Sequence, residues 1–133
     1  MVTRRHLLDA NVLIALTVQE HEHHDRVSRW MRDVEGFALT PVVEGALVRY
    51  LLRLGESPRT ALRLLVAVQG LAGAAFWRDD LSYADVDLGH VQGHRQVTDA
   101  YLASVVRARP PARLATLDEG LALAAPDVVD LVP

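Results

Sequence analysis

Two kinds of apolar pattern alternate along the chain. Short apolar runs of strand length are separated by longer stretches in which apolar positions recur every three or four residues, the period of an amphipathic helix. The short runs predict strands that end at residue 8 and span 37–39, 74–77, 113–117 and 128–132, of which 74–77 is the weakest. The longer stretches predict helices over 12–16, 22–34, 41–54, 58–71, 97–107 and 119–124. This alternation predicts an α/β fold with three layers, in which helices cover both faces of a central parallel sheet of four to five strands (α/β/α). We expect a single domain over residues 1–133.

The predicted helix ends carry recognisable start and stop residues. Thr40-Pro41 and Ser57-Pro58 each place a hydroxyl at the cap and a proline at the first helical position. Gly55 is expected to end the helix 41–54 in a left-handed conformation. The helix 58–71 is apolar around most of its circumference, so we expect it to pack on more than one side, either inside the monomer or against a second copy or partner.

Composition narrows the possible functions. The formal net charge of -3 argues against a protein that binds nucleic acid through a bulk positive field, so any RNA or DNA must be held locally. The absence of cysteine excludes disulfides and thiolate metal sites. All fourteen basic residues are Arg, which excludes Schiff-base chemistry and the phosphate-binding Lys of a P-loop. Without a membrane-length apolar run or a secretory pattern at the start, we expect a cytoplasmic protein with no membrane association.

Four acids follow predicted strands or begin the helices after them: Asp9, Glu44, Asp99 and Asp118. Asp9 is the clearest, because it lies at a strand-to-helix junction inside an apolar run. The carboxyl ends of parallel strands share one edge, so all four acids are expected at the same rim. Converging carboxylates repel one another, and oxygen ligands suit Mg²⁺ or Mn²⁺, which predicts metal-dependent phosphodiester hydrolysis. The alternative is that each acid merely caps a helix N-terminus, where negative charge is favoured.

The sequence resembles a known family in the same places. The stretches 7–13 (LLDANVL), 40–44 (TPVVE), 93–102 (GHRQVTDAYL) and 114–118 (LATLD) are similar, in order, to the successive motifs of PIN-domain ribonucleases, and more closely of the VapC toxins. The resemblance covers nearly the whole chain. It implies a PIN-like domain and a Mg²⁺-dependent endoribonuclease. Asp9 and Asp99 are implied as the most direct metal ligands, Glu44 as completing the acidic pocket, and Asp118 as binding metal or water less directly.

Three polar residues are candidates for positioning the substrate or the acids. By resemblance, Asn11 and Thr116 match the polar positions that orient neighbouring acids. Arg95 stands one helical turn before Asp99 and could pair with an RNA phosphate, although a solvated loop arginine is the equal alternative.

The resemblance also implies partners. It implies a toxin held inactive by a cognate VapB-type antitoxin, a homodimer of the toxin, and binding of operator DNA only through the antitoxin. The alternative from another class is a non-catalytic PIN-fold binding module that acts only by association with its partner.

Other interpretations of the sequence are weaker. His21, His23 and His24 lie among acids, but neighbouring histidines cannot easily share one helical face, so a solvated helix start is preferred to a metal site or to the His-Asp pair of HD phosphohydrolases. His90 and His94 are expected to be ordinary loop residues, with RNA contact as an alternative for His94. Receiver domains and haloacid-dehalogenase phosphatases rely on a lysine that this chain lacks.

Overall fold

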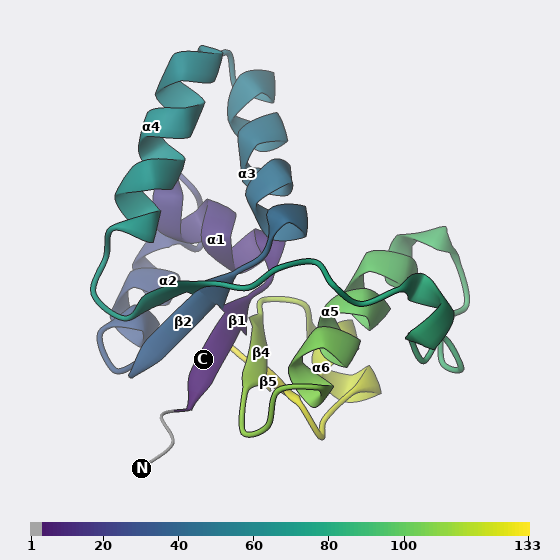
Figure 1. Ribbon diagram of the computed structural model, residues 1–133. Helices are drawn as coiled ribbons and strands as arrows, with labels where there is room; N and C mark the ends of the chain where they lie inside the picture. The colour runs from purple at the N-terminus through teal and green to yellow at the C-terminus, as the bar shows by residue number, and fades with distance from the viewer. Residues whose placement is uncertain (1–3) are drawn as a thin grey trace.

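A five-stranded parallel sheet forms the centre of the computed structural model, which describes residues 4–133 (Figure 1). Its strand order is β3-β2-β1-β4-β5. The strands are β1 (Arg5–Leu8), β2 (Gly36–Leu39), β3 (Ala74–Phe76), β4 (Arg113–Thr116) and β5 (Val129–Leu131). In the centre, Leu7 of β1 pairs with Ala38 of β2 on one side and with Leu114 of β4 on the other. The predicted α/β fold is confirmed, and the weak run near residue 75 is a strand at the edge of the sheet.

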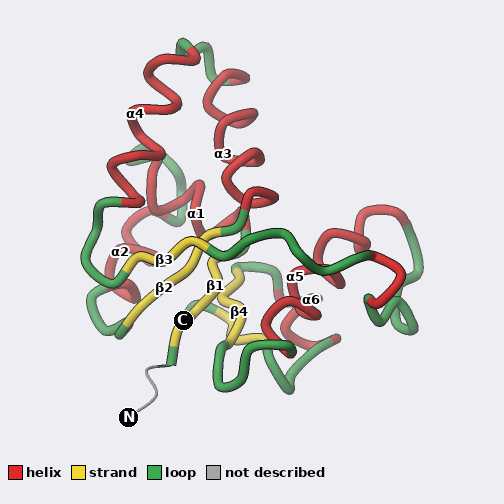
Figure 2. Tube along the Cα trace, viewed as in Figure 1, coloured by secondary structure: helices red, strands yellow, loops and turns green. Residues whose placement is uncertain are grey.

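Six α-helices cover the sheet within residues 4–133. They are α1 (Ala10–Thr17), α2 (His24–Met31), α3 (Pro41–Arg53), α4 (Pro58–Gln69), α5 (Val97–Arg107) and α6 (Glu119–Ala124). Right-handed connections, the rule for parallel strands, place α1 to α4 on one face and α5 and α6 on the other. The contacts agree with this arrangement, because α1 packs against α2 and α3, whereas α5 packs on β4 and α6 on β5. Figure 2 shows α3 and α4 rising together from the sheet as a helical hairpin.

The core is built from the apolar side chains of the strands and of the sheet-facing helix positions. Leu7 and Leu8 in β1, Leu114 in β4 and Leu102 in α5 are fully buried. Because β1 lies in the middle and has helices over both faces, both of its last residues are apolar and the usual alternation is lost. A buried strand of this kind holds the residue that follows it in a fixed position.

The helix starts are confirmed in part. The Ser57 hydroxyl accepts a hydrogen bond from the Thr60 amide at 3.1 Å, and Gly55 has a φ of +96°. Thr40 precedes α3, but its side chain makes no capping bond, and its buried hydroxyl has no hydrogen-bond partner within residues 4–133. The fixed φ of Pro41 is therefore the local signal that begins this helix.

Helix α4 has one buried and one exposed apolar face. Ala61, Leu65 and Val68 are buried, whereas Leu62 and Val66 are 56% and 62% exposed. Packing within the monomer is therefore confirmed, since α4 packs on α3. The apolar side chains left at the surface keep packing against a second copy or partner a prediction. Within residues 4–133, no helix combines the length and apolar character needed to cross a membrane.

Candidate functional site

Two of the four predicted acids lie where the connections leave the sheet in opposite directions. After β1 the chain passes to α1 on one face, and after the adjacent β4 it passes to α6 on the other. At such a switch point the two connections diverge and leave a crevice beyond the carboxyl ends of the strands. Asp9 directly follows β1, and Asp118 lies two residues beyond the end of β4. Strand order therefore brings these two acids together.

Asp9 is buried and fully engaged in hydrogen bonds. Its side chain is the N-cap of α1, where Oδ1 accepts from the Ala10 amide at 2.7 Å, and its Oδ2 accepts from the Thr116 hydroxyl at 2.7 Å. Only 6% of the residue is exposed. Burial raises the pKa of Asp9 above its usual value, the hydrogen bonds from Thr116 and Ala10 oppose this rise, and the nearby charge of Asp118 adds to it.

Thr116 and Asn11 tie the turn after β4 to Asp9. The Thr116 hydroxyl donates to Asp9 and also accepts a bond from the Asp118 amide at 3.0 Å. Asn11 Oδ1 accepts from the Leu117 amide at 3.1 Å, and Asn11 Nδ2 donates to Thr116 Oγ1 at 3.4 Å. Both residues therefore lie beside Asp9 and the backbone that leads to Asp118, and their role in orienting the acids for catalysis stays a prediction.

Asp118 is also a helix cap. Its Oδ1 accepts from the amides of Gly120 at 2.9 Å and Leu121 at 3.3 Å, at the start of α6. The capping alternative is thus correct for both Asp9 and Asp118. It does not compete with convergence, because capping two helices that start at adjacent strands places both carboxylates at the same crevice.

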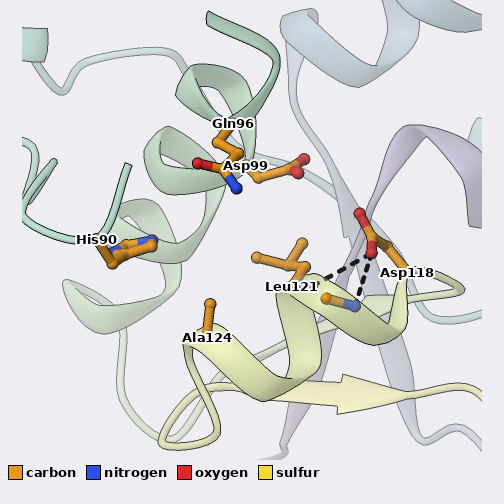
Figure 3. Close-up of a pocket in the computed structure, with 7 residues that line it drawn as sticks. His90, Gln96, Asp99, Asp118, Leu121 and Ala124 are labelled. Atoms are coloured by element: carbon orange, nitrogen blue, oxygen red, sulfur yellow. Dashed lines mark hydrogen bonds between the residues drawn. The ribbon is translucent and has the colours of Figure 1, made fainter. Parts of the chain in front are cut away.

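Asp99 comes to this crevice from a third element, the first turn of α5. Burial first, and then the charges of Asp9 and Asp118, raise the pKa of Asp99 from 3.8 to about 6. Figure 3 shows the carboxylates of Asp99 and Asp118 pointing toward each other at one side of a cavity of about 160 Å³ that both residues line. Asp9, Asp99 and Asp118 therefore form one electrostatically coupled group.

Glu44 lies apart from this group. It is in the first turn of α3, on the same edge of the sheet, but its Oε2 accepts a 2.9 Å hydrogen bond from Gln69 Nε2 of α4. Both residues line a different cavity, of about 450 Å³, next to the ends of β2 and β3. The structure thus brings three of the four predicted acids together and directs the fourth toward α4.

Arg95 is exposed in a short 3₁₀ helix, His94–Gln96, that leads into α5. It borders a shallow hollow formed by residues 92–96 and does not line the cavity of Asp99. Arg95 is close to Asp99 in the sequence, but in the fold its side chain is exposed to solvent. Phosphate binding by Arg95 stays a prediction.

The three converging acids fit a hard divalent cation by their chemistry. All are oxygen donors, and in the described part of the chain none of them forms an ion pair with an Arg or His. Burial is the main cause of the raised pKa of Asp99, and the charges of Asp9 and Asp118 add to it. A divalent cation would relieve the repulsion between these acids. Within residues 4–133, no three acidic or histidine side chains stand close enough together to enclose a metal ion in the conformation described.

Two residues of the cavity were not expected from the sequence. His90 and Gln96 line it together with Asp99 and Asp118, and Figure 3 shows His90 on the side opposite Asp118. The interpretation of His90 as an ordinary loop residue missed this position. Gln96 carried a usable signal, since it precedes Asp99 by three residues and so lies near it on one helical face. For His90 the sequence offered none, because it lies in an irregular loop.

Comparison with known proteins identifies the family. The chain is 52% identical to ribonuclease VapC29 of Mycobacterium tuberculosis over 128 residues, which cover 96% of each chain. The chain belongs to the VapC ribonuclease family. A second relative, ribonuclease VapC39 of the same species, is 39% identical and covers 87% of this chain and 90% of its own length. No protein-family model matches the sequence.

Two solved structures share the fold of this VapC ribonuclease. M. tuberculosis VapC20, described as a toxin that cleaves the sarcin-ricin loop, matches with a TM-score of 0.68 at 17% identity over 89% of this chain and 93% of that one. VapBC2 from Rickettsia felis, bound to a DNA fragment from its promoter, matches with a TM-score of 0.62 at 10% identity over 97% and 99%. The implied PIN-like fold is confirmed by these VapC neighbours.

Proposed function

We propose that this VapC ribonuclease is a Mg²⁺-dependent endoribonuclease that acts as the toxin of a toxin-antitoxin system. The observation that carries the proposal is the convergence of Asp9, Asp99 and Asp118 at the switch point between β1 and β4. In the sequence, Asp99 and Asp118 follow Asp9 by 90 and 109 positions. Relatives named ribonucleases, 52% and 39% identical, support the reaction class. The description of VapC20 as a toxin supports the biological role.

In this proposal Asp9 and Asp99 would be the direct metal ligands, and Asp118 would bind the metal or its water less directly. Bound Mg²⁺ or Mn²⁺ would activate water and stabilise the charge that develops on the phosphodiester. Thr116 keeps Oδ2 of Asp9 in place through its 2.7 Å hydrogen bond. Asn11 holds the backbone that leads to Asp118 through the Leu117 amide. Glu44 would join the acidic pocket only after leaving Gln69.

We further propose the partners of the chain: a VapB-type antitoxin, a second copy of the toxin, and operator DNA reached only through the antitoxin. The neighbour from R. felis is described as a VapB and VapC pair on promoter DNA, which supports this assembly. The exposed apolar side chains of α4, Leu62 and Val66, offer a surface for the second copy. A formal charge of -3 makes direct DNA binding by the toxin unfavourable.

The first experiment measures RNA cleavage by the antitoxin-free protein. Transfer RNA, ribosomal RNA and messenger RNA are each incubated with Mg²⁺ or with EDTA, and the new 5′ ends are mapped. We expect Mg²⁺-dependent products from the wild type and none from Asp99→Asn. A matched control is Asp127→Asn, which removes a surface acid that pairs with Arg107 at 2.8 Å away from the crevice. Equal products from wild type and Asp99→Asn, or none from the wild type on any RNA, would support the non-catalytic binding module instead.

The second experiment tests toxicity. Expression of the wild-type chain alone should arrest growth, and co-expression of its antitoxin should restore it. Asp9→Ala should permit growth at equal protein levels. Arrest by Asp9→Ala as strong as by the wild type would separate toxicity from catalysis.

A further inference from the structure

The cavity beside Asp99 and Asp118 has a second wall that the acids do not form. It is made by the Gln96 side chain from the start of α5, by the His90 ring, and by Leu121 and Ala124 of α6 (Figure 3). Its volume of about 160 Å³ is smaller than the roughly 300–1,000 Å³ of pockets that enclose drug-sized ligands. The space therefore suits one ring system next to the acids.

The orientation of the Gln96 amide is set by its own hydrogen bond. Oε1 accepts from the backbone amide of Gln92 at 2.6 Å, a bond that only the oxygen can make. The amide nitrogen is consequently the free end, and Figure 3 shows it turned into the cavity, away from the oxygen. The cavity thus presents the two N–H donors of the Gln96 amide, for which the described residues 4–133 provide no hydrogen-bond acceptor.

The remaining surfaces are flat or apolar. His90 is partly buried and contributes an aromatic ring, Leu121 is 5% exposed, and Ala124 contributes a methyl group. Unstacked RNA bases are held by aromatic rings, His included, and are read by hydrogen bonds along their edges. A ring surface, an apolar floor and a fixed donor pair, next to acids that would face a phosphate, are the elements that such a subsite requires.

We propose that this cavity is a nucleobase subsite that selects the RNA base beside the cleaved phosphodiester, with Gln96 as the specificity residue and His90 as the stacking surface. The Gln96 donors select an acceptor, so the subsite takes guanine or uracil, which carry a carbonyl where adenine and cytosine carry an amino group. The inference rests on the proposed ribonuclease function and assigns it a base preference.

The first test reads binding without cleavage. Guanosine, uridine, adenosine and cytidine monophosphates are titrated into the full-length protein in EDTA and, separately, in Mg²⁺, which offsets the repulsion between the acids and the phosphate. The side-chain amide signals of Gln96 are followed by NMR. Guanosine and uridine monophosphate should shift these signals, with affinities about 5- to 10-fold higher than those of the other two, the size of one neutral hydrogen bond. If none of the four nucleotides moves the Gln96 signals at millimolar concentration, the subsite is refuted, whether or not the protein cleaves RNA.

The second test inverts the preference. Gln96→Glu keeps the side-chain shape and one oxygen for the Gln92 amide, but it replaces the free donors with an acceptor. We expect it to prefer adenosine and cytidine monophosphates, and in cleavage to move the cut sites from guanine or uracil to adenine or cytosine. Because the added negative charge weakens the binding of every nucleotide, only the ratio of affinities between bases is compared. Gln19→Glu, at an exposed turn, controls for net charge. An unchanged ratio in Gln96→Glu overturns the assignment of Gln96.

The third test concerns stacking. His90→Ala should raise KM for RNA about 10-fold, the size of one lost base stack, with a smaller change in kcat. His90→Phe should restore KM, because it keeps a ring and loses the ring nitrogens. Failure of His90→Phe to restore KM would show that His90 does not act by stacking. A wild-type protein that binds the nucleotides selectively but cleaves no RNA would refute the ribonuclease proposal and leave the subsite in place.

Discussion

The Thr116 hydroxyl donates a 2.7 Å hydrogen bond to Oδ2 of Asp9, across 107 residues of sequence and between the ends of the neighbouring strands β1 and β4. The same oxygen accepts from the Asp118 amide at 3.0 Å. One buried side chain therefore sets the position of one acid directly and of a second through the backbone. This relationship explains how two helix caps come to lie at one crevice.

Replacing Thr116 tests that relationship. Thr116→Val keeps the volume and removes the hydroxyl, so Asp9 loses one of its two hydrogen bonds within a buried position. We expect RNA cleavage to fall about 10- to 100-fold, as for other residues that orient metal ligands, and the Mg²⁺ concentration for half-maximal activity to rise. Thr116→Ser should retain most activity. Wild-type Mg²⁺ dependence in Thr116→Val would contradict an orienting role.

The raised pKa of Asp99, caused first by burial and then by the charges of Asp9 and Asp118, makes its ionised form a source of instability. The folded pKa of about 6 lies above the ordinary 3.8, so ionisation is harder in the folded state, and stability falls as pH rises from about 4 to 6. Without divalent cations, Asp99→Asn should therefore unfold at a higher temperature than wild type above pH 6, by a few degrees, and the difference should vanish near pH 4. The shift corresponds to about 3 kcal/mol at most, and partial exposure reduces this to about 1–2 kcal/mol.

A surface acid, Asp127, should show the opposite effect of ionisation on stability. The hydrogen bond from Arg107 lowers the pKa of Asp127, so its ionised form stabilises the fold at neutral pH. Asp127→Asn should lower the unfolding temperature slightly at pH 7 in the same buffer. If both variants shift in the same direction, the cost of ionising the buried Asp99 beside the other acids is not the cause of the Asp99 effect.

The contact between Glu44 and Gln69 predicts how the fourth acid behaves. Gln69→Leu removes the 2.9 Å hydrogen bond that holds the Glu44 carboxylate against α4. If Glu44 serves the acidic pocket, this variant should reach half-maximal cleavage at about two- to fivefold lower Mg²⁺, because less energy is spent in releasing the side chain. Glu44→Gln should require more Mg²⁺ than wild type. An unchanged Mg²⁺ titration in Glu44→Gln would exclude Glu44 from the site.

Replacing Arg95 should weaken RNA binding without slowing the chemical step. Its exposed guanidinium lies in the 3₁₀ helix before α5, so Arg95→Ala should raise KM for RNA several-fold with little change in kcat. Loss of one phosphate contact should also reduce the slope of log affinity for RNA against log salt concentration by somewhat less than one. Arg59→Ala, at an exposed position in the first turn of α4, is the matched control. Equal effects of the two substitutions would assign Arg95 to the solvated surface.

The exposed face of α4 predicts self-association. Leu62 and Val66 stand one turn apart, and both are more than half exposed at 56% and 62%. The double substitution Leu62→Glu and Val66→Glu places two charges on this face, so a dimer formed there should become monomeric in analytical ultracentrifugation. Leu123→Glu, which alters an 82% exposed leucine on α6, should leave the mass unchanged. A double variant that remains dimeric would place the interface elsewhere.

Local patterns were enough to predict most of the elements. Apolar periodicity, the proline and hydroxyl starts of α3 and α4, and Gly55 after α3 depend on neighbours within a few residues, so they can be recognised in one chain. The predicted helix over 22–34 is shorter in the structure, at His24–Met31, since helix ends depend on packing as well as on pattern. The acids at the strand ends belong to the same local class, because each follows a strand or opens a helix.

The sequence alone therefore determined the α/β alternation, the helix caps and the identity of the acids, all of which follow from short-range propensity and burial. Only the tertiary structure decided that β1 and β4 are neighbours, which joins Asp9 to Asp118 and both to Asp99. It also turned Glu44 toward Gln69 and brought His90 and Gln96 into the cavity of the acids. These outcomes depend on strand order and on side-chain directions between segments far apart in the chain, and periodicity within one segment carries no information about either.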